Sequence, residues 1–74
     1  MSRTLADLKP GERGRILRIG GGGPVVQRLM SMGLLEDAEV EVIRRAPAGD
    51  PIEIRVMDYA LSLRREEARA VEVG

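Results

Sequence analysis

Apolar and polar residues alternate with a period of two along most of the second half of this 74-residue chain. In the segment 39–43, Val40 and Val42 share one face and glutamates occupy the other. Because successive side chains of a strand point to opposite faces of a sheet, the alternation predicts half-buried β-strands. The predicted strands are 14–19, 39–43, 52–56, 59–63 and 71–73. The further residues predicted to face the core in the later strands are Ile52, Ile54, Val56, Tyr59, Leu61, Leu63, Val71 and Val73.

Four of these strands follow one another with connections too short for helical crossovers, which predicts an antiparallel, meander-like sheet. Five short strands in a chain of this length predict a small barrel. Asp58 is predicted as a tight-turn residue, since Asp tolerates left-handed backbone better than a β-branched residue does. The longer turn before residue 52 contains Pro47, Gly49, Asp50 and Pro51. Such residues occur in any turn of this kind, so they favour an ordinary turn over a partner-contacting tip.

One segment has helical spacing instead. Between Pro24 and Met32, apolar side chains recur three and four residues apart, with Leu29 in the middle. Pro24 stands at the first helical position and Gly33 where a left-handed C-terminal cap belongs, with Leu34 placed to pack back on the last turn. We therefore predict a short helix over 24–32, and a further single turn of helix over 65–68.

The composition removes several classes of function. The chain has no Cys and no His, which excludes thiolate and imidazole ligands and a histidine general base. Twelve basic and 12 acidic residues balance, and Tyr59 is the single aromatic residue, so neither the charge nor the stacking surface of a nucleic-acid module is present. Lack of disulfides fits a reducing compartment, and no signal peptide or long apolar run is found. We expect a cytoplasmic protein without membrane insertion.

The remaining motifs favour structural interpretations over chemical ones. The glycine run 20–23 precedes the predicted helix and could hold a phosphate, but it lacks the Lys and Ser or Thr of a nucleotide loop, which favours a flexible connection. Two carboxylate groupings match no calcium loop and are interpreted as solvated charge. They are Asp50 with Glu53, and Glu36 with Asp37 and Glu39. Met30 and Met32 are interpreted as core or contact residues and not as metal ligands. No nucleophile or cofactor site is predicted, so the chain is not expected to be an enzyme.

Four segments, read in order, carry a family resemblance. They are LADLKPGERGRILRI, QRLMSMGLLEDAEVEVIRRAPAGDPIEIRV, YALSLRREEA and RAVEV. This order resembles the FeoA family of small cytoplasmic proteins of bacterial ferrous iron uptake, from Leu5 to Val73. Its most specific part is RLMSMGL followed by VIRRAPAGDPIEIRV. The chain departs from the family at Glu36 and Asp37, often Pro-Gly, and at Asp58, often Gly, so the tightness of these turns differs.

The resemblance implies one SH3-like domain over 1–74, a five-stranded antiparallel barrel with a helix inserted after the first strand. It also implies a non-enzymatic accessory protein that contacts the cytosolic part of FeoB, the GTP-binding ferrous iron transporter. The resemblance favours the hypothesis that the hairpin tip contacts a partner. Two prolines in the tip support it, because they lower the entropic cost of presenting such a surface. The expected contact residues are Pro47, Gly49, Asp50 and Pro51 of the tip, with Arg28 and Met32 of the helix as a second patch.

Two other functions remain open at this point. One is a metal-responsive SH3-like regulatory domain like those appended to iron-dependent repressors, although the winged helix that normally accompanies them has no counterpart in these residues. The other is a small nucleotide-binding or enzymatic protein that uses the glycine run. Exposed strand edges also predict weak self-association.

Overall fold

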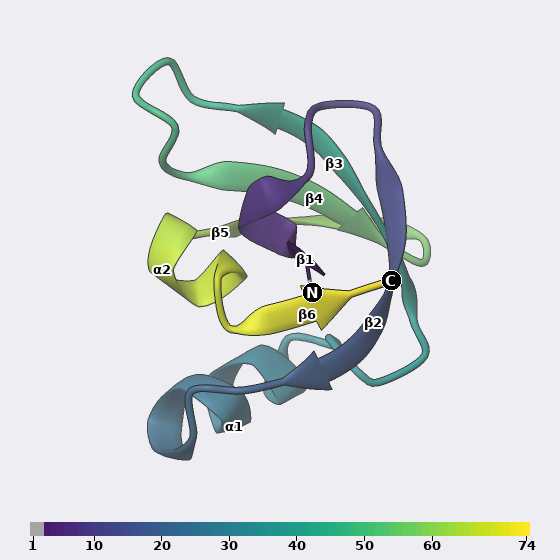
Figure 1. The fold of residues 1–74 in the computed structure, drawn as a ribbon, viewed down its shortest axis with the longest axis vertical. Helices are drawn as coiled ribbons and strands as arrows, with labels where there is room; N and C mark the ends of the chain where they lie inside the picture. The colour runs from purple at the N-terminus through teal and green to yellow at the C-terminus, as the bar shows by residue number, and fades with distance from the viewer. Residues whose placement is uncertain (1–2) are drawn as a thin grey trace.

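A computed structural model describes residues 3–74 as an antiparallel sheet curled around an apolar core, with one longer helix at its side (Figure 1). Its elements are β1 (Arg3–Thr4), the 3₁₀ turn η1 (Leu5–Asp7), β2 (Arg13–Ile19), α1 (Gly23–Ser31), β3 (Glu39–Arg45), β4 (Ile52–Val56), β5 (Tyr59–Leu63), α2 (Arg65–Ala68) and β6 (Val71–Val73). The strand order is β1-β6-β2-β3-β4-β5, and every pairing is antiparallel. No helix within residues 3–74 is long and apolar enough to cross a membrane.

The five predicted strands, their antiparallel arrangement and the inserted helix are confirmed. The expected four-strand meander is present only over β3 to β5, because β6 pairs with β2 and not with its predecessor β5, which curls the sheet into a barrel. Register shifts in β2 at 16–18 and in β3 at 42–44 fit the local bending that such a curl requires. The two-residue strand β1 and the turn η1 were not predicted, because two or three residues are too few to show a period.

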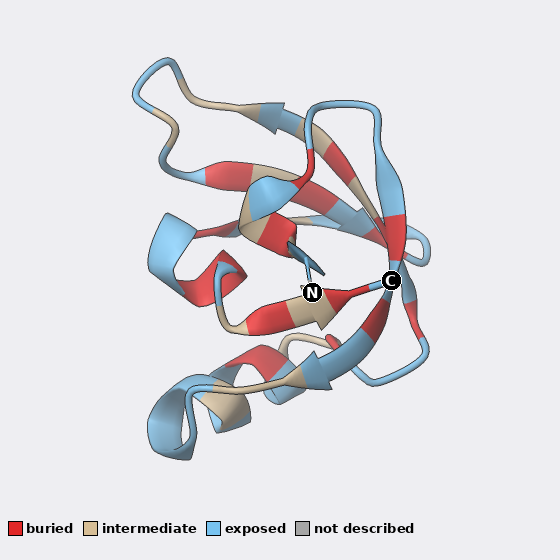
Figure 2. Ribbon diagram, in the orientation of Figure 1, coloured by how far each residue is buried: buried red, intermediate tan, exposed pale blue. Residues whose placement is uncertain are grey.

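The core lies where the alternation places it. Val40, Val42 and the apolar members of β4 and β6 are all buried, and Figure 2 shows buried and more exposed residues alternating along β4. Tyr59 differs, because it remains 41% exposed at the start of β5 although it has the parity of buried Leu63. Strand β5 lies at the edge of the sheet, so fewer neighbours cover its first residues.

The end of α1 has the predicted glycine cap. Gly33 adopts φ +97° in the left-handed region. Its N–H donates to the Met30 carbonyl at 3.0 Å, and the Leu34 N–H donates to the Leu29 carbonyl at 3.1 Å. Leu29 and Leu34 are both fully buried. These two hydrogen bonds, together with the buried pair Leu29 and Leu34, form a Schellman motif, which satisfies the last carbonyls of the helix.

The turn between β4 and β5 corrects one detail. Met57 and Asp58 form a two-residue connection between the paired residues Val56 and Tyr59. The left-handed residue of this turn is Met57, with φ +56°, and not Asp58. A positive φ at the first of two turn residues matches a type II′ hairpin, whose twist suits antiparallel strands. A second left-handed residue is Asp37, with φ +73°.

Candidate partner-binding surface

The hairpin tip between β3 and β4 is an exposed loop. Pro47, Asp50 and Pro51 are exposed and Gly49 is half-buried. Gly49 adopts φ +84°, and its N–H donates to the Ala46 carbonyl at 2.7 Å, which closes the turn. The need for a left-handed residue explains why Gly occupies position 49. The tip is therefore a defined surface that carries one carboxylate.

A hydrogen bond joins this tip to helix α2. The Asp50 Oδ1 accepts the backbone N–H of Arg65 at 3.0 Å. Arg65 is the first residue of α2, and the first N–H groups of a helix have no partner inside the helix. A carboxylate at this end also suits the helix dipole. Asp50 therefore stabilises α2 while it stays exposed at the hairpin tip.

The same helix also binds α1. The Arg28 Nε lies 3.2 Å from the Glu67 Oε2, and the Glu67 Oε1 accepts the Arg64 N–H at 2.9 Å. Glu67 is only 6% exposed, so its charge needs partners. Arg28 and the backbone of Arg64 supply them. One buried carboxylate thus joins both helices.

These contacts bring two predicted contact regions to one side of the molecule. Figure 1 shows the hairpin tip, α2 and α1 following one another along the left edge of the view. Three open hollows of about 480, 310 and 450 Å³ run along this side, and neighbours share Pro51 or Arg64. The hollow between α1 and α2 is lined by Gly21, Val25, Arg28, Arg64, Glu66, Glu67 and Ala70. We call this side, from Pro47 to Arg28, the α2 face.

Met32 does not lie on the α2 face in the same way. It caps α1, is half-buried and packs against the core, and its carbonyl accepts the Tyr59 hydroxyl at 2.8 Å. The exposed apolar side chains of α1 are instead Val25, at 36%, and Met30, at 44%. Sequence reasoning missed Arg64, Glu67 and Val25 as lining residues. Only the apolar spacing of α1, which continues past the core-facing Leu29, could have indicated Val25.

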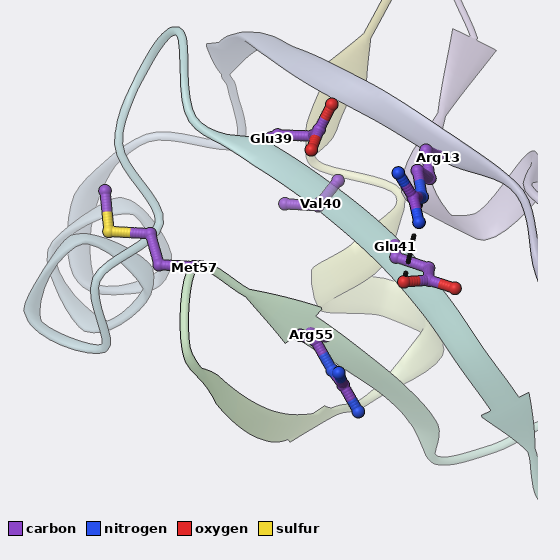
Figure 3. A pocket seen from close by; sticks show the side chains of 6 residues that line it. All are labelled: Arg13, Glu39, Val40, Glu41, Arg55 and Met57. Atoms are coloured by element: carbon purple, nitrogen blue, oxygen red, sulfur yellow. Dashed lines mark ion pairs between the residues drawn. The ribbon is translucent and has the colours of Figure 1, made fainter.

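A fourth hollow lies over strands β2, β3 and β4. It measures about 240 Å³ and is lined by Arg13, Glu39, Val40, Glu41, Arg55 and Met57. Figure 3 shows Arg13 and Glu41 facing each other, with Arg13 Nε 3.8 Å from Glu41 Oε1, while Met57 stands apart at the turn. Two arginines and two glutamates balance here, so the hollow offers no strong field to a charged ligand.

Of the groups considered for metal or phosphate binding, Asp50, Glu53 and the glycine run have structural roles. No group of three or more His, Cys, Asp or Glu residues that could hold a metal ion occurs within residues 3–74. Asp50 accepts the Arg65 N–H, and Glu53 pairs with Arg44. In the glycine run, Gly21, Gly22 and Gly23 all have positive φ, which other residues rarely adopt. The run is therefore required for the chain reversal from β2 into α1.

Comparison with known proteins identifies relatives along nearly the whole chain. Residues 3–74 match the FeoA domain family. A fusion of Fe(2+) transport protein A with the Fe(2+) transporter FeoB from Porphyromonas gingivalis is 39% identical over 69 residues, which cover 93% of this chain and 8% of the fusion. The FeoA protein of Chlorobium tepidum is 38% identical at a TM-score of 0.88, over 96% of this chain and 68% of its own. The FeoA-like protein of Clostridium acetobutylicum is 30% identical at 0.92, over 99% and 85%.

More distant structures share the fold alone. The zinc complex of Stenotrophomonas maltophilia FeoA, a prokaryotic SH3 domain protein, is 24% identical at a TM-score of 0.85, over 97% of this chain and 89% of its own. A manganese-dependent transcriptional repressor is 23% identical at 0.90, and this chain covers 36% of it. The barrel is thus SH3-like, as predicted. With its described length matched from end to end, the chain belongs to the FeoA family.

Proposed function

We propose that this chain acts in bacterial ferrous iron uptake as a cytoplasmic, single-domain accessory protein that contacts the cytosolic, GTP-binding part of FeoB. The observation that carries the proposal is the α2 face. Two contacts, Asp50 to Arg65 and Arg28 to Glu67, hold the hairpin tip and α1 against one short helix. A partner that docks there meets both predicted contact regions at once. The fusion relative, in which the FeoA and FeoB parts share one chain, supports the same partner.

The chemistry of the α2 face suits a protein partner. Its hollows are open and combine charged side chains with small apolar ones such as Val25 and Ala70. The aromatic groove that binds proline-rich peptides needs several aromatic residues, and Tyr59 is the only one in the chain. The expected contact is therefore aliphatic and polar, with Pro47, Gly49, Asp50 and Pro51 at one end of the α2 face and Arg28 at the other. Met32, the remaining expected contact residue, is half-buried at the end of α1.

Isothermal titration calorimetry of the purified chain against the cytosolic part of FeoB tests the proposal. We expect saturable binding, weakened at least about tenfold by Asp50→Lys, because the substitution reverses the charge at the hairpin tip. Glu36→Lys makes the same change of charge in the loop between α1 and β3 and should leave binding unaltered. Absence of heat and of co-elution at high micromolar concentration would count against the proposal, as would equal effects of both variants.

The repressor-like alternative rests on likeness of fold. A domain that responds to metal by itself needs a ligand set, and residues 3–74 contain no cluster of three candidate ligands. Titration of the chain with Fe²⁺ under reducing conditions separates the two functions. Binding tighter than millimolar would favour the regulatory alternative.

A further inference from the structure

Strand β5 has a free backbone edge. It pairs with β4 on one side, and within residues 3–74 no strand pairs with its other side. The other end of the sheet is β1, which is only two residues long. A short edge strand offers little to a foreign strand, whereas β5 offers five residues.

The register shows which backbone groups are free. Val56 and Tyr59 flank a two-residue turn, so they exchange hydrogen bonds, as do the pairs Ile54–Leu61 and Ile52–Leu63. The N–H and C=O groups of the alternate residues, Ala60 and Ser62, therefore point to the free side. In the part of the chain that the structure describes, no backbone hydrogen bond from outside the hairpin reaches them. Both residues are exposed.

The composition of β5 does not protect this edge. Natural edge strands usually carry charged residues or Pro, which oppose pairing with another chain. The five residues of β5 are Tyr, Ala, Leu, Ser and Leu, without charge or Pro. Charged residues occur only at the two ends, with Asp58 before the strand and Arg64 after it. Among residues 3–74, neither side chain takes part in an ion pair.

The free backbone groups and the end charges of β5 are self-complementary under a two-fold axis. When two copies of β5 run antiparallel with Leu61 opposite Leu61, Ala60 lies opposite Ser62 of the second copy. These are the residues with free backbone groups, so each such pair exchanges two hydrogen bonds. The same register places Asp58 opposite Arg64, and opposite charges across a strand pair are favourable. Tyr59, 41% exposed, then lies opposite Leu63.

We infer that β5 is the pairing edge of an isologous dimer, in which two copies of this chain join their sheets through β5 centred on Leu61. A two-fold interface uses the same patch on both copies, as this register requires. The occupant of the edge is a second copy, because charge and backbone groups match within one strand. The inference is independent of the proposed contact with FeoB, since its test contains no transporter.

Analytical ultracentrifugation of the full chain, from about 10 µM to about 1 mM, tests the dimer. We expect reversible association to twice the 8.1 kDa mass of the chain. Ser62→Pro removes an N–H that β4 does not use and should weaken association at least about tenfold. Circular dichroism checks that the variant remains folded.

A charge exchange makes the test specific to the register. Asp58→Arg and Arg64→Asp should each weaken the dimer, because each leaves like charges facing across the axis, and the double variant should restore it. Arg55→Asp is the matched control, since Arg55 lies in β4 of the same hairpin and away from the free edge. A chain that stays monomeric at about 1 mM overturns the inference. Association that continues beyond a dimer also overturns it, because it indicates head-to-tail pairing. A double variant that associates as weakly as the single variants overturns it too.

Discussion

Gly33 is the residue at which the end of α1 and the start of β5 meet. Its φ of +97° is left-handed, and the space where a Cβ would stand is filled by the Tyr59 hydroxyl, which donates to the neighbouring Met32 carbonyl. Position 33 therefore has to be glycine for two separate reasons. The helix cap needs a left-handed backbone, and the tyrosine needs the absence of a side chain.

Gly33→Ala should lower the free energy of unfolding by about 3 kcal/mol, because it combines left-handed strain with a steric clash and a disturbed hydrogen bond. Urea unfolding measures the loss. Gly11→Ala is the matched control, since Gly11 has φ +90° but no atom lies within 4 Å of the place that a Cβ would take. It should cost about 1 kcal/mol from strain alone. Equal losses at both glycines would contradict the role assigned to Tyr59.

The cap of α1 could be predicted because the residues that mark it lie close together in the sequence. Pro24, Gly33 and Leu34 mark the helix within a dozen residues of one another, so the sequence indicates its end. Tyr59 is 27 residues from the carbonyl that it binds, and no local pattern indicates that contact. The same limit applies at Met57, where strand pairing imposes a positive φ on a residue that does not favour it.

Helix α2 shows the corresponding limit for a whole element. Its single turn at 65–68 was predicted from the chain, but its role as the junction between the hairpin tip and α1 was not. Asp50 is 15 residues from Arg65, and Arg28 and Glu67 come from opposite halves of the chain. Of the predicted contact residues, five therefore lie along one face for reasons that only the tertiary structure reveals, whereas Met32 packs against the core at the end of α1.

Arg28→Met should lower the free energy of unfolding by about 1 kcal/mol, since it keeps much of the apolar stem but leaves the buried Glu67 without its counter-charge. The loss should shrink in high salt, because Arg28 is itself largely exposed. Arg44→Met is the control. Arg44 pairs with Glu53 on the open face of the sheet, and its loss should cost under about 0.5 kcal/mol. Thermal unfolding at low and high salt compares the two, and a salt-independent loss at Arg28 would contradict the ion-pair explanation.

At the scale of the whole molecule, alternation predicts strands and their faces but not the closure of the barrel. Period two places Val40, Ile54 and Val71 in the core whichever strands are neighbours. The position of β6 beside β2 depends on bulges and on contacts far apart in the sequence. Another contact between distant parts of the chain is made by Arg45 at the end of β3, whose guanidinium donates to the carbonyls of Ala6 and Leu8 around η1.

Arg45 therefore joins the N-terminal turn to the long hairpin, across nearly 40 residues of chain. Arg45→Met keeps an apolar stem but leaves two partly buried carbonyls without a donor, and it should lower the free energy of unfolding by about 2 kcal/mol. Arg55→Met, at an exposed arginine of β4, should change it by less than about 0.5 kcal/mol. Urea unfolding gives both values, and amide exchange should show faster opening of η1 in the Arg45 variant alone. If η1 keeps its protection in that variant, burial of Leu5 and Leu8 holds the N-terminal turn in place without the arginine.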